Sequence, residues 1–281
     1  MTISKAGLEA QKEGGRKAMA ILRARYGSNL TKITLEGKRL KRIRKSKALE
    51  DEYNSFFENI EVKLPEKEIN FSSTDIKKNM KFPTAMSSEL AEEIGAHLGD
   101  GCLSYKKNYF SIKSDKKEEG YFTGFLFNIY KNLFNLDLKL MHTPNVCGFE
   151  VCSKALAEFK NKVIGLPYGE KVENIKIPQI ITDTKNKEIY RALLRGLFDT
   201  DGCIALVKKT YPVIDITIKS QSLISEAKNM LEKLGFICSG TKWSIRLNGT
   251  IMLNKWIKEI GSNNPKNIKR LQIAQSSAPV V

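Results

Sequence analysis

Apolar and polar positions follow the same order twice along this chain, about a hundred residues apart. Residues 94–102 and 194–203 both read as an apolar helix with small residues along it, and both helices end in an Asp followed by Gly. Small residues at facing positions let two helix backbones approach closely. We expect Gly101 and Gly202 to end the helices, because glycine adopts the left-handed backbone conformation common at helix C-termini.

The residues that follow these two helices also match in pattern. Each Asp-Gly pair precedes residues that predict a strand, a turn with a Lys-Lys pair, and a second strand of alternating polarity. An amphipathic helix comes next in each half, near residues 121–134 and 223–234. A further strand pair and a helix complete each copy. The pattern therefore predicts an α+β protein with two αββαββα repeats, at residues 86–181 and 182–281.

The repeat places one aspartate at the end of each predicted helix. A single Asp-Gly after an apolar helix is typical of an ordinary helix end, but two matched copies bring Asp100 and Asp201 together if the helices pack side by side. Neighbouring carboxylates repel unless a cation neutralises them. Mg²⁺ favours oxygen ligands in a site that leaves positions open for water and phosphate. Such a site on a basic protein indicates phosphodiester hydrolysis.

The two segments also match a known nine-residue motif. Residues 194–202 keep its Leu, Gly, Leu, Asp, Asp and Gly positions, and residues 94–101 match it more loosely. With two motifs and matched repeats, the chain resembles the monomeric, two-motif LAGLIDADG homing endonucleases over about residues 86–275. The resemblance implies that the motif helices pack at a pseudo-twofold axis and that the antiparallel sheets form a saddle over DNA. It implies a site-specific endonuclease that hydrolyses one phosphodiester bond on each strand of double-stranded DNA.

The resemblance assigns a metal site to the two motif ends. Asp100 and Asp201, the last acidic residues of the motifs, would bind Mg²⁺ (or Mn²⁺) and direct water at one strand each. Gly99 and Thr200, the residues just before them, would each offer a backbone carbonyl to the metal.

Basic residues near the motifs are the further candidates. The resemblance implies a role for Lys113 and Lys219, which the sequence places at the ends of matching strands: they would polarise the scissile phosphates or order water. The residues expected to contact DNA are Lys106, Lys107, Lys208, Lys209, Lys171 and Gln221.

Two polar residues inside the motifs are expected to be structural. Asp199 occupies the other acidic position of the pattern, where the first motif has Leu98. We expect Asp199 to stabilise the helix end. We expect His97 to be packed or hydrogen-bonded near the helix pair rather than to act as a general base.

The composition of the chain indicates which class of molecule it binds. Lysine and arginine number 47 against 31 acidic residues, and the net charge of +16 favours a polyanionic partner. No stretch has the apolar length of a membrane-spanning helix, so we expect no membrane partner. The first residues lack the apolar core of a signal peptide, and an odd number of cysteines argues against a disulfide framework. We therefore expect an intracellular protein; the sequence does not distinguish cytoplasm from an organelle, and cytoplasm is favoured. The resemblance to the monomeric, two-motif form implies a monomer.

Residues 1–85 lie outside the repeats and form a basic extension, with a run of lysines and arginines over residues 38–47. The run fits either a solvated charged helix or an accessory region that binds nucleic acid. Ser87 or Ser88, just after the extension, is expected to cap the first motif helix.

Two other functions fit the same features. One is an RNA maturase that binds intron RNA and assists its splicing, which the basic extension would suit. The other is a DNA-binding regulator that has lost cleavage. Retention of Asp100 and Asp201 favours the endonuclease over the regulator, whereas the sequence does not separate the endonuclease from the maturase.

Overall fold

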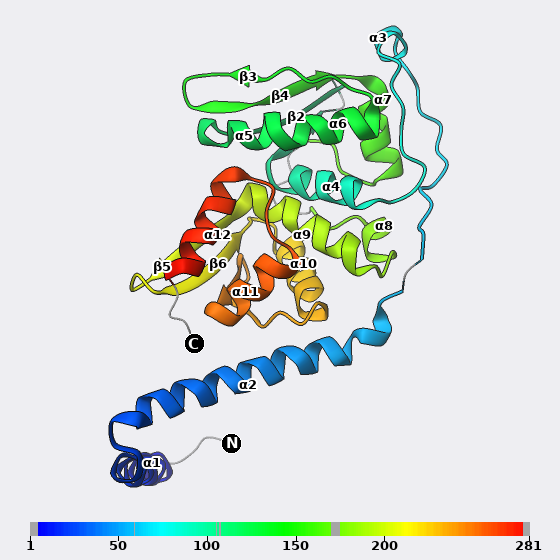
Figure 1. Ribbon diagram of the computed structural model, residues 1–281. Coiled ribbons are helices and arrows are strands. Elements are labelled where there is room, and N and C mark those ends of the chain that lie inside the picture. The colour runs from blue at the N-terminus through cyan, green and yellow to red at the C-terminus, as the bar shows by residue number, and fades with distance from the viewer. Residues whose placement is uncertain (1–4, 59, 105, 107, 170–174, 278–281) are drawn as a thin grey trace. The chain divides into compact units, whose positions relative to one another are not determined.

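The computed structural model describes residues 5–58, 60–104, 106, 108–169 and 175–277. The chain divides into two compact units, residues 1–45 and residues 46–280. The first unit contains helix α1 (Lys5–Tyr26), a 3₁₀ turn and most of helix α2 (Leu30–Glu52), which continues into the second unit (Figure 1). None of the helices in the described ranges is long and apolar enough to cross a lipid bilayer.

The segment between α2 and the first motif helix packs with the second unit. It holds a 3₁₀ turn (Asn54–Phe56) and helix α3 (Ser73–Lys77). Residues 62–64 and 84–86 run antiparallel, because the Leu64 N–H donates to the Thr84 carbonyl at 2.8 Å. The Ser87 hydroxyl accepts from the Leu90 N–H at 3.2 Å and caps the first motif helix, as the sequence predicts.

The first repeat has the predicted order of elements. Its members are α4 (Ser88–Asp100), β1 (Gly101–Ser104), β2 (Tyr109–Asp115), α5 (Glu119–Tyr121), α6 (Phe127–Phe134), β3 (Met141–His142), β4 (Val146–Cys152) and α7 (Lys154–Glu158). Short 3₁₀ and π-helical turns extend three of these helices, at 116–118, 122–126 and 159–163. The strands form an antiparallel sheet in the order β1-β2-β4-β3.

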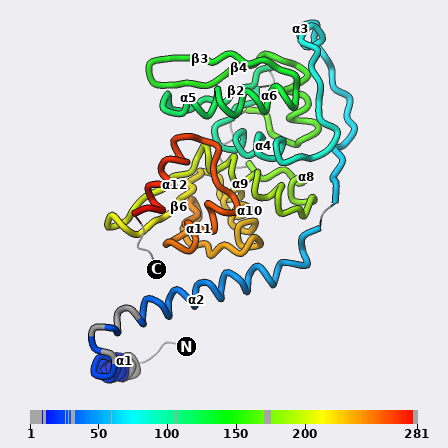
Figure 2. Tube along the Cα trace, in the orientation of Figure 1, coloured from blue at the N-terminus to red at the C-terminus, as the bar shows by residue number. Residues whose placement is uncertain are grey.

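The second repeat follows the same plan. Its members are α8 (Gln179–Thr182), α9 (Lys187–Asp201), β5 (Gly202–Val207), β6 (Tyr211–Thr217), α10 (Gln221–Lys233), β7 (Cys238–Thr241), β8 (Ser244–Asn248), α11 (Thr250–Glu259) and α12 (Pro265–Ser277). Its antiparallel sheet has the equivalent order, β5-β6-β8-β7. The α+β fold with two αββαββα repeats is therefore confirmed, and Figure 2 shows the chain tracing one repeat after the other.

Alternation along the strands gives each sheet one covered face. Phe110 and Ile112 of β2 are fully buried under helices of the first repeat, and Ile214 and Ile216 of β6 are buried in the same way in the second. The intervening residues face away from this core. Because strand side chains alternate between faces, each sheet keeps a second face that is more open to solvent.

The two motif helices, α4 and α9, lie side by side between the sheets (Figure 1). A Cβ atom on Gly95 would lie 2.2 Å from the Leu193 carbonyl oxygen. A Cβ atom on Gly196 would lie 2.1 Å from the Glu92 carbonyl oxygen. Both distances are below any real contact, so only glycine permits this approach, and the predicted role of the small residues is confirmed.

A polar contact also joins the two motif helices. Nε and Nη2 of Arg195 donate to Oε2 of Glu92 at 2.9 and 2.6 Å, and Arg195 Nη1 donates to the Ile260 carbonyl at 3.0 Å. Asn263 Nδ2 donates to the other Glu92 oxygen at 2.6 Å. Glu92 is almost fully buried, so these donors supply the hydrogen bonds that a buried carboxylate needs.

Candidate active site

The motif aspartates lie at the same end of the α4–α9 pair. A Cβ atom on Gly99 would lie 2.0 Å from Thr200 Oγ1 and 3.0 Å from Asp201 Oδ2. The absence of a side chain at residue 99 therefore lets the Asp201 carboxylate approach the α4 backbone beside Asp100. Asp100 and Asp201 are both partly buried. The expected pairing of the two helix ends is thus present.

Gly101 and Gly202 follow the aspartates, but the expected left-handed conformation is wrong for both. Gly101 has φ −75° and ψ 154°, and Gly202 has φ −88° and ψ 152°, which are extended. The chain passes directly from each helix into a strand. A Cβ atom at Gly101 would lie 2.6 Å from the His97 carbonyl oxygen, and one at Gly202 would lie 2.3 Å from that of Phe198. Glycine is therefore required at both positions because a Cβ atom would clash, and not because the backbone has a positive φ.

The oxygen donors at this end fit a hard divalent cation. The two carboxylates supply charge, and the backbone carbonyls of Gly99 and Thr200 are the neutral donors that the family resemblance implies. The Thr200 hydroxyl donates back to its own helix, at 3.1 Å to the Gly196 carbonyl and 3.0 Å to that of Leu197. In the described part of the chain no group of three or more His, Cys, Asp or Glu side chains suits a metal. Binding there would therefore need water or phosphate oxygens as well.

Several acidic side chains lie near the helix ends and act on a buried tyrosine. The Tyr121 hydroxyl is buried, and its pKa is raised well above the usual value, first by burial and then by Asp199, Glu92, Glu118 and Asp100. Four carboxylates thus act on one buried phenol. Two of the four are also paired with basic side chains, Glu92 with Arg195 and Glu118 with Lys266.

Asp199 is a structural residue, as the sequence predicts. Its side chain is 1% exposed. It accepts hydrogen bonds from the Ser262 hydroxyl and, at 2.7 Å, from the Asn263 N–H. Burial raises the pKa of Asp199 to about 7. The carboxyl group therefore fixes the loop between α11 and α12 to the end of α9.

His97 is packed in the core of the first repeat. The side chain is fully buried, and its ring stacks on Phe110 with centroids 5.2 Å apart and planes 10° apart. This agrees with the packed role expected for His97 rather than with general-base catalysis.

Lys113 lies on β2 and is partly exposed. It forms an ion pair with Glu150 of the neighbouring strand, and the Tyr109 hydroxyl donates to the same carboxylate at 2.6 Å. The Glu150 carboxylate raises the pKa of Lys113. The ammonium group is thus charged, and it lies at the open face of the first sheet in a pair with Glu150.

Lys219 is not the counterpart of Lys113, contrary to the expectation of matching strand ends. Gly101 pairs with Ile112, and Gly202 pairs with Ile216, so the residue equivalent to Lys113 is Thr217. Lys219 is exposed and lies two residues farther on, beyond β6. The Ile-Lys-Ser tripeptide occurs in both repeats but at positions that are not equivalent, because the segment between the paired residues is longer in the second repeat.

The predicted DNA-contacting residues fall mainly in two equivalent hairpin turns. Lys106 is exposed in the turn between β1 and β2, and Lys208 and Lys209 are exposed in the turn between β5 and β6, with φ of 52° and 67°. Gln221 is exposed at the start of α10. Lys107 and Lys171 lie outside the described residues.

Several residues on the open face of the second sheet had no signal in the sequence. Nε of Arg246 lies 2.5 Å from Asp215 Oδ2, and the Thr217 hydroxyl donates to Asp215 Oδ1 at 2.7 Å. Trp243, in the β7–β8 turn, is 40% exposed with Lys242 Nζ 5.0 Å from its ring centroid. Strand orientation decides which of these residues face outward, and the sequence does not fix it.

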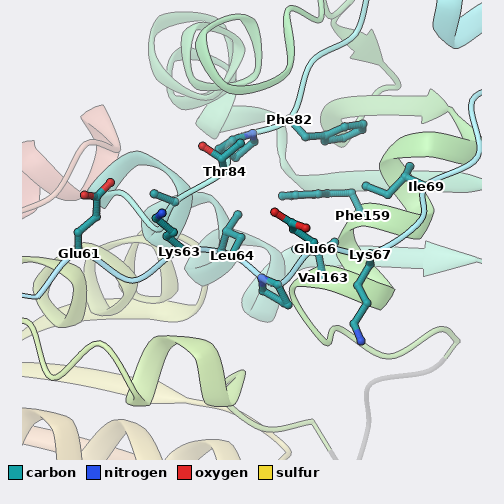
Figure 3. A pocket seen from close by; sticks show the side chains of 13 residues that line it. Glu61, Lys63, Leu64, Glu66, Lys67, Ile69, Phe82, Thr84, Phe159 and Val163 are labelled. Atoms are coloured by element: carbon teal, nitrogen blue, oxygen red, sulfur yellow. The ribbon is translucent and has the colours of Figure 1, made fainter.

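A surface cavity of about 350 Å³ lies away from these residues, on the flank of the first repeat (Figure 3). Its apolar floor includes Phe82 and Phe159, whose stacked rings lie 4.6 Å apart, and Lys63 and Glu66 are among the charged residues at its edge. It contains none of the residues predicted for the site, and so it is not the candidate active site.

A family model described as "LAGLIDADG-like domain" matches residues 188–254, which run from the start of α9 into α11. The chain contains a LAGLIDADG-like domain. The match includes the second motif with Asp201 and most of the second repeat. The first repeat lies outside the matched residues. It shares its strand order with the second repeat, and its motif helix makes glycine contacts with the second motif helix that are reciprocated. No curated protein shows detectable sequence similarity to the chain.

Solved structures with a similar arrangement include three that are described as follows. I-DmoI in complex with DNA and Mn is 17% identical, over 62% of this chain and 96% of that one, with a TM-score of 0.44. Full-length DUF199/WhiA from Thermatoga maritima is 12% identical, over 74% and 66%, with a TM-score of 0.43. The LAGLIDADG meganuclease I-AabMI bound to uncleaved DNA is 11% identical, over 68% and 90%, with a TM-score of 0.37. Because these TM-scores lie below 0.5, the solved structures carry no argument here, and the LAGLIDADG-like domain rests on the match to residues 188–254.

Proposed function

We propose that this LAGLIDADG protein is a site-specific endonuclease that cleaves both strands of double-stranded DNA. The observation that carries the proposal is the meeting of the two motif ends, where Asp201 Oδ2 lies 3.0 Å from the Cβ position of Gly99, the neighbour of Asp100. Each half of one chain thus contributes one aspartate to a common centre. A single chain supplies both, so we propose a monomer as the active form.

Asp100 and Asp201 would hold a divalent cation, Mg²⁺ or Mn²⁺, together with the carbonyls of Gly99 and Thr200. When bound, the cation would lower the pKa of water and neutralise charge on the scissile phosphates. The chain's own part is to fix the two carboxylates at the ends of rigidly packed helices. Lys113 would place a positive charge at the open face of the first sheet, suited to a phosphate that gains negative charge.

The DNA would lie along the open faces of the two sheets. Hairpin turns with Lys106 in one repeat and Lys208 and Lys209 in the other would contact the phosphate backbone. Exposed strand residues such as Arg246 would face base edges in the major groove. The net charge of +16 supports a polyanionic partner.

A DNA-binding regulator without cleavage is the second candidate. Thr217 occupies the position equivalent to Lys113, so a lysine at this place is present in one half only. An incomplete pair of phosphate-contacting lysines favours a protein that binds DNA without cleaving both strands. The two candidates differ in one measurable property, cleavage in the presence of a divalent metal.

The test is cleavage of a library of long duplexes by the purified chain with Mg²⁺ or Mn²⁺, followed by sequencing of the ends. We expect discrete ends at one target site. Asp100→Asn and Asp201→Asn should each reduce double-strand cleavage at least 100-fold while changing the Kd for the target by less than fivefold. Asp137→Asn is the matched control, because Asp137 is exposed, pairs with Lys131 and lies outside both motifs.

Two results would reject the proposal. Full double-strand cleavage by both motif variants would show that these carboxylates do not hold the metal. Tight, sequence-selective binding without cleavage by the unmodified chain in either metal would favour the regulator.

A further inference from the structure

The first 45 residues carry most of the chain's excess charge. This unit contains thirteen lysines and arginines against three acidic residues, so it holds +10 of the net +16 in about a sixth of the length. The density of positive charge is greatest in α2, between residues 38 and 47. The two repeats themselves are therefore only moderately basic.

Four of the basic residues of α2 form a stripe along one side of the helix. Lys38, Lys41, Arg42 and Lys45 are spaced i, i+3, i+4 and i+7, which places them within about 100° of arc on an α-helix. The three lysines are exposed and Arg42 is half-buried. At 1.5 Å per residue, the stripe extends for about 10 Å along the helix axis. We call these four residues the basic stripe.

The other sides of this helix do not form an apolar surface. Leu40 and Ile43 are 43% and 39% exposed, but Arg44 and Lys47 share their side of the helix and are also exposed. A helix that inserts into a membrane surface needs a continuous apolar face. Charge on every side favours a hydrated polyanion, and a stripe of like charge about 10 Å long matches a row of backbone phosphates.

The last turns of α2 are fixed to the second repeat. The buried Ser46 hydroxyl donates to the Gly235 carbonyl at 2.6 Å, and Lys255 Nζ lies 3.4 Å from Glu50 Oε1. Gly235 has φ +80°, and a Cβ atom there would lie 3.0 Å from the Ser46 carbonyl oxygen. The basic stripe is therefore joined through continuous helix to the unit that holds the motif aspartates. A second contact tethered in this way raises affinity through effective concentration.

We propose that the basic stripe is a second nucleic-acid-binding site, which contacts phosphates of duplex DNA other than those contacted by the two sheets. The proposal rests on the proposed function in that both sites bind one DNA molecule. Its contacts are to phosphates, so it adds affinity and length of footprint without base preference. The ligand class is duplex DNA of any sequence.

The test compares the full-length chain with a variant that changes Lys38, Lys41, Arg42 and Lys45 to Gln. Glutamine has a helix propensity close to that of lysine and arginine, so α2 should persist, which circular dichroism checks. The charge-matched control changes Lys131, Lys154, Lys228 and Lys258 to Gln; these four lie on the helices α6, α7, α10 and α11. Kd is measured in EDTA for random-sequence duplexes of about 15 and 50 base pairs, from 50 to 200 mM salt.

The stripe variant should lose salt dependence on the longer duplex. Four phosphate contacts contribute a slope of about 3 to 4 in log Kd against log salt, so unmodified protein should lose about 100-fold more affinity than the variant between 50 and 200 mM. The control variant should change the slope by less than one. On the short duplex the stripe variant and the unmodified chain should differ by less than threefold.

Equal slopes for the stripe variant and the unmodified chain on the longer duplex would overturn the proposal. An equal loss in the control variant would also overturn it, since total charge would then explain the effect. A third contrary result is a loss confined to vesicles of anionic phospholipid or to structured RNA, with duplex DNA unaffected. Cleavage in Mg²⁺ is measured separately. The experiment can therefore show that the basic stripe does not bind DNA while the chain still cleaves it, or that the stripe binds DNA while the chain does not cleave it.

Discussion

At the scale of single residues, burial decides which of the motif carboxylates is structural. Asp199 and Asp201 are two residues apart on α9, yet Asp199 is 1% exposed and bonded to the α11–α12 loop, whereas Asp201 is partly exposed beside Gly99. Position on the helix circumference separates them, since residues two apart point in different directions. The same argument separates His97, which stacks inside the core, from Asp100 at the helix end.

The buried Asp199 predicts a pH dependence of stability. Its pKa of about 7 in the folded protein exceeds the value of 3.8 expected for an unfolded chain, so the folded state holds a proton more tightly. This contribution to stability is fully present below pH 3.8 and is lost as the pH rises to about 7, with a magnitude of the order of 4 kcal/mol. Asp199→Asn should flatten this part of the profile.

Urea unfolding of both proteins at a series of pH values between 4 and 8 measures the effect. The unmodified chain should lose stability with rising pH over this range relative to the variant. Parallel profiles for the two proteins would show that Asp199 does not titrate as its buried position requires.

Single residues also show where sequence reasoning was sufficient and where it failed. The cap at Ser87 could be predicted because it depends on a local pattern, and the aspartate pair because two matched motifs predict that their helices pack side by side. The equivalence of Lys113 and Lys219 failed because strand register depends on hairpin length, which a repeated tripeptide does not reveal. The conformation of Gly101 failed because a strand follows the helix with no intervening turn.

At the scale of elements, the close approach of α4 and α9 is the feature on which the site depends. Gly95→Ala and Gly196→Ala would each place a methyl group about 2 Å from a backbone carbonyl of the other helix. The helices would have to separate, and we expect a loss of at least about 2 kcal/mol in stability. Metal-dependent cleavage should also fall under conditions where the variants remain folded, because separation of the helices moves the two carboxylates apart.

Gly124→Ala is the matched control, since a Cβ atom there meets nothing within 4 Å and the residue is helical. It should be neutral or slightly stabilising. Thermal unfolding of the three variants and their cleavage rates check both expectations. Tolerance of alanine at residues 95 and 196 would contradict the packing described for the motif helices.

The pairing of β5 with β6 sets a second expectation at this scale. Lys113 in the first sheet corresponds to Thr217 in the second, so a lysine charge lies at only one of the two equivalent positions. We expect the two strands of the target to be cleaved at different rates. Supercoiled plasmid with one target site should therefore pass through a nicked circle before it becomes linear.

A time course on agarose gels measures this directly. Lys113→Met should slow one strand preferentially and change the ratio of nicked to linear product. Conversion to linear DNA without a nicked intermediate would contradict the asymmetry between the sheets.

At the scale of the whole molecule, the repeat plan could be predicted from the sequence but the division of the chain could not. The two αββαββα units followed from alternating polarity and from the matched motifs. The helical unit ends at residue 45, and residues 46–85 pack with the repeats, because buried residues such as Leu64 and Asp75 belong to that core. Charge marks the basic extension but does not locate that boundary.

The whole account depends on two aspartates from separate halves of the chain sharing divalent cations. The most direct measurement is a crystal structure with Mn²⁺ and target duplex, in which anomalous scattering locates the metal. We expect Mn²⁺ about 2.1 Å from carboxylate oxygens of both Asp100 and Asp201, with the scissile phosphates beside it. Metal bound elsewhere, or these two carboxylates turned away from the duplex, would contradict the account.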